Sequence, residues 1–327
     1  MNIHDLMELC MRPAPLGGEE EAKNWLRSMM PDTVEITEDP AGSLIVRKPG
    51  KRPGIAFMAS LSQPALLVTG GTAEGSWLLR PFGAGENLEA VSGWEVTDGQ
   101  TITTTVQFED GKLRLAEEKG LRPGMLLTRT RRWSQDKQAV SCTSLADCVG
   151  CWFLVQLLQS LPETACEITC IFLAQEAHNP KTAELAANET GVSVCIRVGT
   201  APVNDESLTG APICAGKGPA LKLRERYAST DGRMLELFRA ACREKDIPFQ
   251  YELLEMTVTG LYTAQYGRCG VVIGGIDVPE EKGRIMLSDL RDTRTLILAL
   301  AQNADAILHT LDSLPATHRV QSAGQMN

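Results

Sequence analysis

Residues 167–179 read EITCIFLAQEAHN, an apolar run that ends in a group of polar side chains. A short, nearly continuous apolar run is typical of a strand buried on both faces of a parallel sheet. Such a strand would deliver Gln175, Glu176 and His178 to its carboxyl end, which is where open α/β sheets bind their ligands. The segment therefore predicts an α/β fold with the functional site at this edge. The alternative is that these polar residues belong to an ordinary loop.

Composition excludes several classes of function. The chain has 327 residues, enough for roughly two domains, and its net charge of −9 leaves it without the basic surface that nucleic acids and anionic membranes require. Its apolar runs are too short to span a bilayer. The first residues, MNIHDLMELCM, lack the basic-then-apolar order of a secretory signal. We predict a cytoplasmic protein that binds neither nucleic acid nor membrane.

The ten cysteines are spread over the whole chain, and several lie inside apolar runs. This distribution favours buried free thiols over a disulfide framework. Cys148 and Cys151 form a C-x-x-C pair, for which a zinc or redox role is the alternative. No second C-x-x-C pair accompanies them, so the thiol interpretation is preferred.

The composition and the hydrophobic pattern of the sequence change twice along the chain. Residues 69–139 are rich in glycine and threonine, and Asp98-Gly99 and Asp110-Gly111 separate short alternating stretches, which predicts hairpins in a small inserted β-barrel domain. Residues 1–68 and 140–314 show α/β alternation and would form one discontinuous domain, followed by a disordered tail at 315–327. Helices are predicted over residues 3–11, 19–30, 147–160 and 289–311, the last of them continuous.

Several short segments resemble motifs of one known family. They are PLGGE at 15–19 for S-G-x-E, DPAGSL at 39–44 for D-x-x-G-N-L, SLADCVG at 144–150 for A-L-D-D-R-x-G, QEA at 175–177 for Q-E-E, and GKGP at 216–219 for a late glycine-proline segment. Their order and spacing resemble the glutamyl aminopeptidase and tetrahedral aminopeptidase family of dinuclear metallopeptidases, which includes proteins labelled endoglucanases. The resemblance covers nearly the whole chain.

The resemblance implies a three-layer α/β fold with a mixed sheet of the zinc-aminopeptidase type and an inserted β-barrel. It also implies two divalent ions held by two histidines and three carboxylates, with a further glutamate as general base. Members of the family form large assemblies, so self-association into a large homo-oligomer is expected.

Position by position, the family's metal ligands are replaced in this chain, although the general-base position keeps Glu176. The ligand positions hold Ser60, Ser62, Ala146, Ala177, Arg197 and Lys282. Only four histidines are present in the sequence, and three of them belong to the first helix, the last helix and the tail. Neither alanine nor a cationic side chain can hold a metal ion. The resemblance therefore implies the family fold without the family's metals.

The replacements lead to a hypothesis about charge. If Arg197 and Lys282 point into the former metal pocket, they could neutralise Glu176, Asp147 and Asp277, because unpaired buried charge is prohibitive. A positive crevice of this kind would attract a peptide or a small anion. The alternative is that both cationic residues face solvent.

Three functions remain open from the sequence. The first is a metal-free relative that binds a peptide, an anion or a partner. The second is an active metal-dependent aminopeptidase with a relocated site and one or two zinc or cobalt ions. Asp147, Glu176 and His178 are the candidates to hold a single ion. The third is a subunit that assembles with an active relative.

Overall fold

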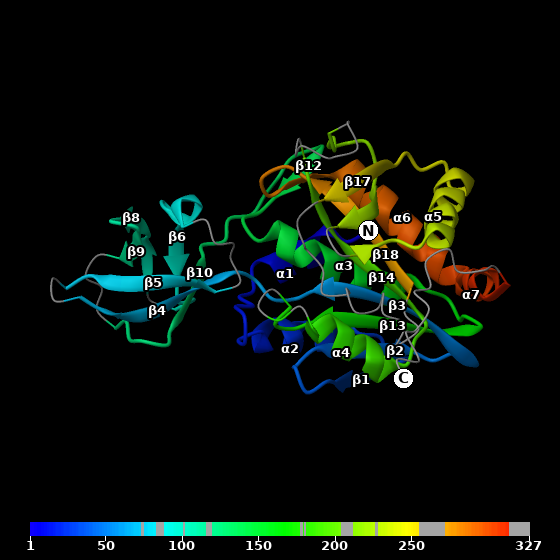
Figure 1. Cartoon of the computed structure of the whole chain (residues 1–327), viewed down its shortest axis with the longest axis horizontal. Coiled ribbons are helices and arrows are strands. Elements are labelled where there is room, and N and C mark those ends of the chain that lie inside the picture. The colour runs from blue at the N-terminus through cyan, green and yellow to red at the C-terminus, as the bar shows by residue number, and fades with distance from the viewer. Residues whose placement is uncertain are drawn as a thin grey trace, which may run out of the picture.

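The computed structural model describes residues 1–72, 75–82, 88–100, 102–115, 120–176, 179, 181–203, 212–225, 228–254 and 272–313 (Figure 1). The predicted disordered tail at 315–327 lies outside these residues. The helices in the described part are α1 (Ile3–Cys10), α2 (Glu20–Met29), α3 (Leu145–Ser160), α4 (Lys181–Thr190), α5 (Gly232–Glu244), α6 (Leu287–Gln302) and α7 (Ala304–Ser313), with a 3₁₀ turn at Glu89–Val91.

Nine of the described strands form a mixed sheet at the centre of the larger lobe (Figure 1). Their order is β1-β2-β13-β3-β14-β18-β15-β16, and β17 also pairs with β15. The strands are β1 (Glu35–Glu38), β2 (Leu44–Lys48), β3 (Arg52–Ser60), β13 (Cys166–Leu173), β14 (Val194–Pro202), β15 (Ala220–Glu225), β16 (Ala228–Ser229), β17 (Gln250–Leu254) and β18 (Val272–Glu280). The strand predicted within residues 167–179 is β13, which is buried almost throughout, so that prediction is confirmed.

The parallel strands β13, β3, β14 and β18 lie side by side and end close together. Leu173 of β13 pairs with Ser60 of β3, and Gly199 of β14 pairs with Asp277 of β18. Because parallel strands share their carboxyl edge, the residues that follow or close these strands meet at one place. That edge carries the site described below.

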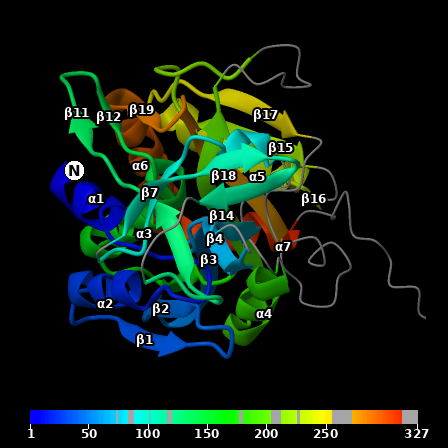
Figure 2. The same ribbon diagram turned by 90° about the vertical axis from the view of Figure 1, so that its left-hand side faces the viewer.

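Side chains of β3 alternate between two buried layers, as the twofold period of a strand requires. Phe57 belongs to the core shared with α1, α3, α5 and α6, whereas Met58 packs with the alanines of α4 on the opposite face. The sheet is therefore covered on both faces, and Figure 2 shows the helical layers on either side of it. This is the three-layer arrangement that the family resemblance implied.

Helix α3 packs unusually close to the sheet because of Gly150. A Cβ atom added there would lie 2.8 Å from the Val198 carbonyl oxygen and 2.9 Å from the Ala59 Cβ. Both distances are shorter than van der Waals contact, and the carbonyl belongs to a rigid strand. The missing side chain thus sets how near α3 comes to the strand ends.

Gly150→Ala is expected to lower the free energy of unfolding by about 1–3 kcal/mol, because the added methyl group overpacks the contact between helix and sheet. The exposed Gly232 in the first turn of α5 provides the control, since glycine to alanine in an ordinary helix stabilises by roughly 0.5–1 kcal/mol. Urea unfolding of both variants measures the difference. A stabilising effect of equal size in both would contradict the close packing.

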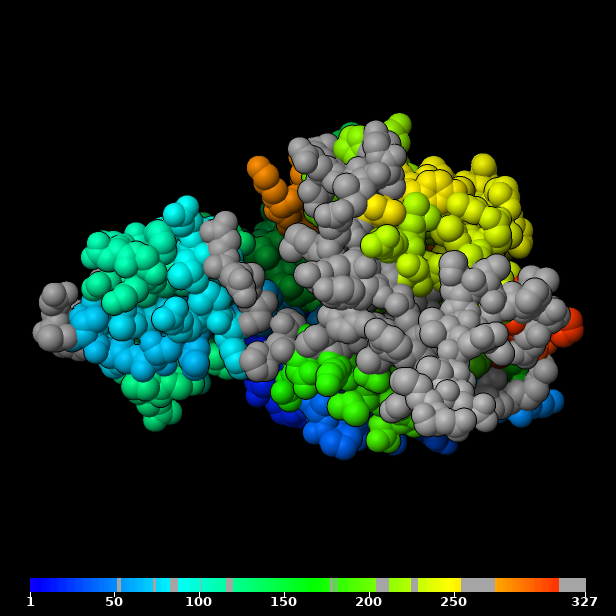
Figure 3. All heavy atoms as spheres, in the orientation of Figure 1, coloured from blue at the N-terminus to red at the C-terminus, as the bar shows by residue number. Residues whose placement is uncertain are grey.

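The segment between β3 and α3 carries a second sheet, which forms the smaller lobe at one end of the molecule (Figure 3). Its seven described strands, in the order β7-β6-β10-β4-β5-β9-β8, are β4 (Ala65–Gly71), β5 (Trp77–Phe82), β6 (Glu95–Thr97), β7 (Thr103–Thr105), β8 (Gln107–Glu109), β9 (Lys112–Leu115) and β10 (Leu126–Arg129). The two end strands β7 and β8 are separated only by Val106, so the sheet curls toward closure and resembles a barrel.

Both hairpin predictions in this lobe are confirmed. Strands β6 and β7 flank Asp98-Gly99, and β8 and β9 flank Asp110-Gly111. Asp110 and Gly111 both have positive φ, 50° and 72°, as a type I′ turn requires. The division of the chain at residues 68 and 139 stays a prediction. Strand β4 begins at Ala65, which lies before the first of these boundaries.

A three-stranded sheet lies where the chain returns to the larger lobe. It consists of β11 (Ser134–Gln135), β12 (Ala139–Ser141) and β19 (Arg284–Met286). The continuous helix predicted over 289–311 is wrong, because the helix starts at residue 287 and breaks at Asn303 between α6 and α7. Across the described ranges, no helix is both long and apolar enough to cross a membrane.

Candidate functional site

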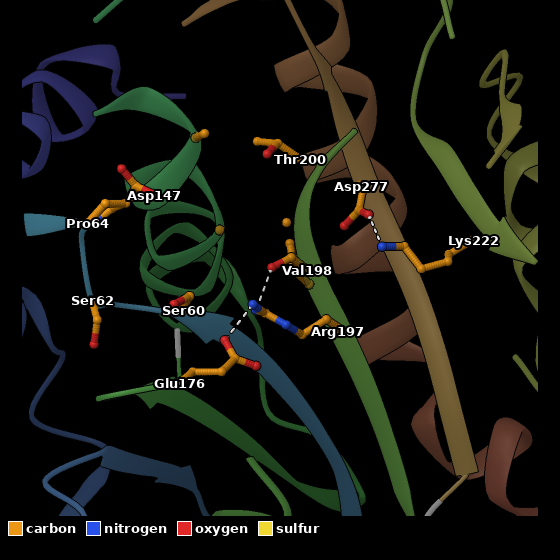
Figure 4. A pocket seen from close by; sticks show the side chains of 13 residues that line it. Ser60, Ser62, Pro64, Asp147, Glu176, Arg197, Val198, Thr200, Lys222 and Asp277 are labelled. Atoms are coloured by element: carbon orange, nitrogen blue, oxygen red, sulfur yellow. Dashed lines mark hydrogen bonds and ion pairs between the residues drawn. The ribbon is translucent and has the colours of Figure 1, made fainter. Parts of the chain in front are cut away.

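A cavity of about 210 Å³ lies at the carboxyl edge of the parallel strands (Figure 4). Strand β3, the first turns of α3, the segment after β13, and strands β14, β15 and β18 all contribute to its wall. The lining residues are Ser60, Ser62, Pro64, Ala146, Asp147, Gly150, Glu176, Arg197, Val198, Gly199, Thr200, Lys222 and Asp277. Three of them are acidic and two are basic, so the electrostatics of the cavity depend on how these five are paired.

The first pair joins Arg197 of β14 to Glu176, the residue at the predicted general-base position. Arg197 Nη2 lies 2.7 Å from Glu176 Oε2, and both side chains are buried. The same guanidinium donates through Nη1 to the carbonyl oxygen of Val198 at 3.1 Å (Figure 4). It also donates through Nη1 to the carbonyl oxygen of Met58 at 3.3 Å. Three contacts therefore fix the cationic head in the cavity wall.

The second ionic group is built around Lys222 of β15. Its Nζ lies 2.9 Å from Asp277 Oδ2 and 3.2 Å from Glu252 Oε2, and all three residues are buried. The strand registers explain the cluster, because Lys222 lies opposite Glu252 on β17 and opposite Gly275 on β18. A Cβ atom on Gly275 would meet Lys222 Cβ at 2.8 Å, so the glycine leaves room for the lysine side chain.

Arg197 and Lys222 lie in one row across the sheet, on either side of Gly275, which pairs with both of them. Directly paired residues on neighbouring strands point to the same face of a sheet. The two buried cations thus enter the same part of the structure from two different strands, each next to a carboxylate. Neither is available as an unpaired positive charge.

Glu252 shares its lysine with Asp277, and this affects its protonation. Burial, together with the negative charge of Asp277, raises the pKa of Glu252 to about 8, although Lys222 opposes the shift. A carboxyl group whose pKa is higher in the folded than in the unfolded state stabilises the folded state, fully so at pH values below its pKa in the unfolded state. That stabilisation is lost as the pH rises through the folded value.

Glu252→Gln is therefore expected to gain stability relative to the wild type as the pH rises from about 5 to about 8, by up to about 1.4 kcal/mol for each pH unit. The amide keeps the shape of the side chain and cannot ionise. Urea unfolding at a series of pH values measures the gain, and Glu35→Gln in the exposed strand β1 is the control. A difference between E252Q and wild type that stays constant over this range would contradict the shared-lysine arrangement.

Asp147, in the first turn of α3, is the third carboxylate of the cavity. Burial raises its pKa to about 7, the charge of Glu280 adds to the effect, and Arg131 opposes it. Burial also raises the pKa of Glu280. Asp147 is therefore a lining group whose charge changes near neutral pH.

The two serines at the end of β3 have different roles. Ser62 donates to Glu19 Oε1 at 2.6 Å and accepts from the Gln175 backbone N–H at 2.6 Å, so its hydroxyl fixes the segment after β13 to the chain before α2. Ser60 lies at the cavity wall, and its carbonyl oxygen accepts from the Cys151 thiol. Neither serine is a strong ligand for a divalent cation.

The predicted site residues fall into three groups. Glu176, Arg197, Asp147, Ser60, Ser62 and Ala146 meet at the cavity. His178 and Ala177 lie outside the described residues. The charge hypothesis is wrong for Lys282. This residue is exposed in the turn between β18 and β19, with a φ of 48°, and it does not line the cavity. The cation beside Asp277 is Lys222 instead.

Lys222 and Glu252 were missed by the sequence analysis, although a signal exists for each. Both are charged residues inside short apolar strands, ALKLRE and QYELL, and a charge at such a position implies a buried partner. The Gly274-Gly275 pair in the neighbouring strand marks the space that one of the side chains occupies. That these two residues meet could not be predicted without knowing the order of the strands in the sheet.

The cavity does not fit a pair of divalent ions. Cationic heads lie 2.7 Å and 2.9 Å from two of its three carboxylates, at places where a metal ion would otherwise neutralise them. Within the described ranges, no three His, Cys, Asp or Glu side chains are grouped as metal ligands. The donor set of the lining is completed by serine hydroxyls, which are weak ligands for such ions.

Comparison with known proteins relates this geometry to a family. The sequence profile described as M42 glutamyl aminopeptidase matches residues 99–292, more than half of the chain. FrvX, a protein of Escherichia coli (strain K12) that is named as an aminopeptidase, is 23% identical over 311 residues, covering 84% of this chain and 85% of FrvX.

Solved structures share the fold at low sequence identity. Aminopeptidase APDkam598 from the archaeon Desulfurococcus kamchatkensis superposes with a TM-score of 0.85 at 18% identity, covering 95% of this chain and 98% of that one. The TET1 peptidase of Pyrococcus horikoshii, which can assemble into a tetrahedron or a large octahedral shell, gives a TM-score of 0.80 at 20% identity and covers 91% and 98%. These likenesses concern the fold.

Proposed function

The chain belongs to the M42 glutamyl aminopeptidase family, and we propose that within this family it is a metal-free member that binds peptides without hydrolysing them. The observation that carries the proposal is the buried ion pair of Arg197 with Glu176 at 2.7 Å. A glutamate that accepts protons in hydrolysis must be able to approach the attacking water. Here an arginine that is itself fixed by two backbone carbonyl groups holds that carboxylate.

Electrostatic balance supports the same conclusion. In a metal centre, two divalent ions supply positive charge, stabilise a cluster of carboxylates and activate water. In this cavity Arg197 and Lys222 supply the positive charge from within the protein. They offset the carboxylates of Glu176 and Asp277 but cannot lower the pKa of a bound water as a divalent ion does. In this proposal the protein keeps the family's fold but not the metal ions that would activate water.

The remaining carboxylate indicates which end of a peptide enters the cavity. The expectation that the crevice would be positive, and would therefore attract anions, needs revision because each lining cation already has a carboxylate partner. Above pH 7 the ionised Asp147 makes the balance negative, which favours a ligand ammonium group. We infer that the amino end of a peptide binds beside Asp147.

Two short peptides test this inference by calorimetric titration. A tripeptide amide carries only an amino group, and an N-acetylated tripeptide carries only a carboxylate. The amide peptide should bind several times more tightly at pH 7.5 than at pH 5.5, because protonation of Asp147 removes its charge in between. Asp147→Asn should abolish this pH dependence. Tighter binding of the acetylated peptide would contradict the assignment.

Hydrolysis is tested separately with aminoacyl p-nitroanilides, in the presence and absence of zinc, cobalt and manganese. No turnover above the protein-free rate is expected in any mixture. Metal-stimulated turnover that is lost in Glu176→Gln would support the competing function, an active aminopeptidase with a relocated or single-metal site. In that case Asp147 and His178 would be the next residues to substitute.

Self-association follows from family membership as a further part of the proposal. Sedimentation velocity of the full chain should give a species much larger than the 35.5 kDa of one chain. A monomer at all concentrations would exclude a homo-oligomer and would direct attention to assembly with an active relative.

A further inference from the structure

Glu19 is a buried carboxylate that connects three separate segments of the chain. It precedes the first turn of α2 and is only 5% exposed. One of its oxygens, Oε1, accepts hydrogen bonds from the Gly17 N–H at 3.0 Å, the Ser62 hydroxyl at 2.6 Å and the Gln175 N–H at 3.3 Å. These donors and the N-terminus of α2 stabilise the negative charge of Glu19. The carboxylate thereby links the chain before α2 to the segments that follow β3 and β13.

Gln175 has a backbone conformation that requires support. Its φ of 57° lies in the left-handed region, which is unfavourable for a residue with a side chain. Its N–H donates to Ser62 Oγ at 2.6 Å as well as to Glu19, and its side-chain Nε2 donates to the Ala41 carbonyl oxygen at 2.9 Å. A strained residue of this kind persists only where its surroundings enforce the conformation. Because Gln175 sets the direction of the chain after β13, it also sets the position of Glu176.

Ser62 is a fixed point from which this support can act. The end of β3 beside it is held to α3, because the Cys151 thiol donates to the Ser60 carbonyl oxygen at 3.0 Å. Cys151 belongs to the C-x-x-C pair, and the described cysteines are all free thiols, as the sequence analysis expected. The Ser62 hydroxyl is oriented by its bond to Glu19, which leaves a lone pair for the Gln175 N–H.

We propose that Glu19 is a positioning residue that holds Glu176 against Arg197. It acts through Ser62 and through Gln175, which directly precedes Glu176. Glu176 Oε2 lies 2.7 Å from Arg197 Nη2, so a change in the direction of the chain after β13 separates the pair (Figure 4). Glu19 itself touches no ligand.

This position matters for specificity, an argument that rests on the proposed function. While Glu176 offsets the charge of Arg197, a ligand ammonium group can enter the cavity beside Asp147. Once Glu176 is released, the uncompensated guanidinium repels an ammonium group and attracts a carboxylate. Glu19 thus determines which end of a peptide binds.

Calorimetric titration at pH 7.5 with the tripeptide amide and the N-acetylated tripeptide tests the effect on specificity. Glu19→Ala should lower the affinity for the amide relative to the acetylated peptide by about tenfold or more. Glu19→Gln should keep most of the wild-type ratio, because its amide oxygen can accept from the same donors. Glu21→Ala is the matched control, since it removes an exposed charge from the first turn of the same helix. An unchanged ratio in E19A, or an equal fall in E21A, would overturn the proposal.

Unfolding in urea tests the position of Glu176 without any peptide. The loss of stability caused by Arg197→Ala should be at least halved in the Glu19→Ala background, because Glu176 is then free to reach water. Independent sites would give additive losses, and additivity would overturn the proposal. If the wild type binds neither peptide, the proposed function fails, whereas this cycle still decides the role of Glu19.

Ser62→Ala gives the same cycle without removing a buried carboxylate, and so covers the case in which E19A does not fold. It breaks the link at its middle, and the loss caused by Arg197→Ala should again be at least halved. Ser28→Ala is the control, because the Ser28 hydroxyl donates to the Trp25 carbonyl oxygen within α2, and its effect should add to that of R197A. Additive losses with S62A would overturn the proposal.

Discussion

Arg197→Ala should lower the free energy of unfolding by about 3–5 kcal/mol at pH 7, the largest effect expected for any single substitution in the cavity. The substitution leaves Glu176, 5% exposed, as a buried carboxylate whose ion-pair partner has gone. The released carbonyl groups of Met58 and Val198 also lose their guanidinium donor. An uncompensated buried charge costs far more than the pair itself contributes.

A double variant shows whether the cost comes from charge. Arg197→Met combined with Glu176→Leu removes both charges and keeps much of the volume, so it should recover most of the loss. Arg284→Ala provides the matched control, because Arg284 pairs with Asp136 on the surface and should contribute less than about 1 kcal/mol. Urea unfolding gives all the values. A loss below 1 kcal/mol in R197A would mean that Glu176 does not depend on this arginine.

Lys222→Met should have the second largest effect, again about 3–5 kcal/mol at pH 7. It removes the cation beside both Asp277 and Glu252, which are 2% and 1% exposed. Adding Glu252→Gln and Asp277→Asn to the same chain removes the charge of Asp277 and both groups that could ionise, at nearly constant shape. The triple variant should therefore be more stable than the single one.

The control for this series is Lys245→Met. Lys245 forms an ion pair with the neighbouring Glu244 at the surface, so its loss should change stability by less than about 1 kcal/mol. Thermal and urea unfolding of these three variants and the wild type measure the order of stabilities. Two results would contradict the inference that Lys222 compensates the buried carboxylates beside it. One is that K222M is as stable as K245M, and the other is that the triple variant is less stable than K222M.

The sequence predicted those parts of the fold in which a local pattern and the tertiary structure agree. The apolar run of β13 could only be a buried strand, and Asp110-Gly111 could only form a tight turn between alternating stretches. The break at Asn303 was missed because helical periodicity continues through it. The asparagine side chain instead caps the end of α6 by donating to the Ala299 carbonyl oxygen at 2.9 Å.

The site was predicted as far as strand ends could be matched to motifs. Glu176 and Arg197 follow from short segments at strand ends that could be matched to family motifs, and the structure brings them together. Lys282 was placed by counting back through a turn. In the structure β18 continues to Glu280, and Lys282 and Gly283 both adopt positive φ, which turns the lysine outward. Lys222 could not be assigned to Asp277 without knowing that β15 lies beside β18.

The most direct test of the central claim, that protein cations stand where this family's metal ions would be, is the metal content of the pure protein. Elemental analysis should be made on protein purified without chelator, and again after incubation with zinc, cobalt or manganese and removal of the excess. We predict well below one ion per chain in every sample, because Arg197 and Lys222 already neutralise the carboxylates. One or two tightly held ions per chain would contradict the account and return the cavity to metal-dependent chemistry.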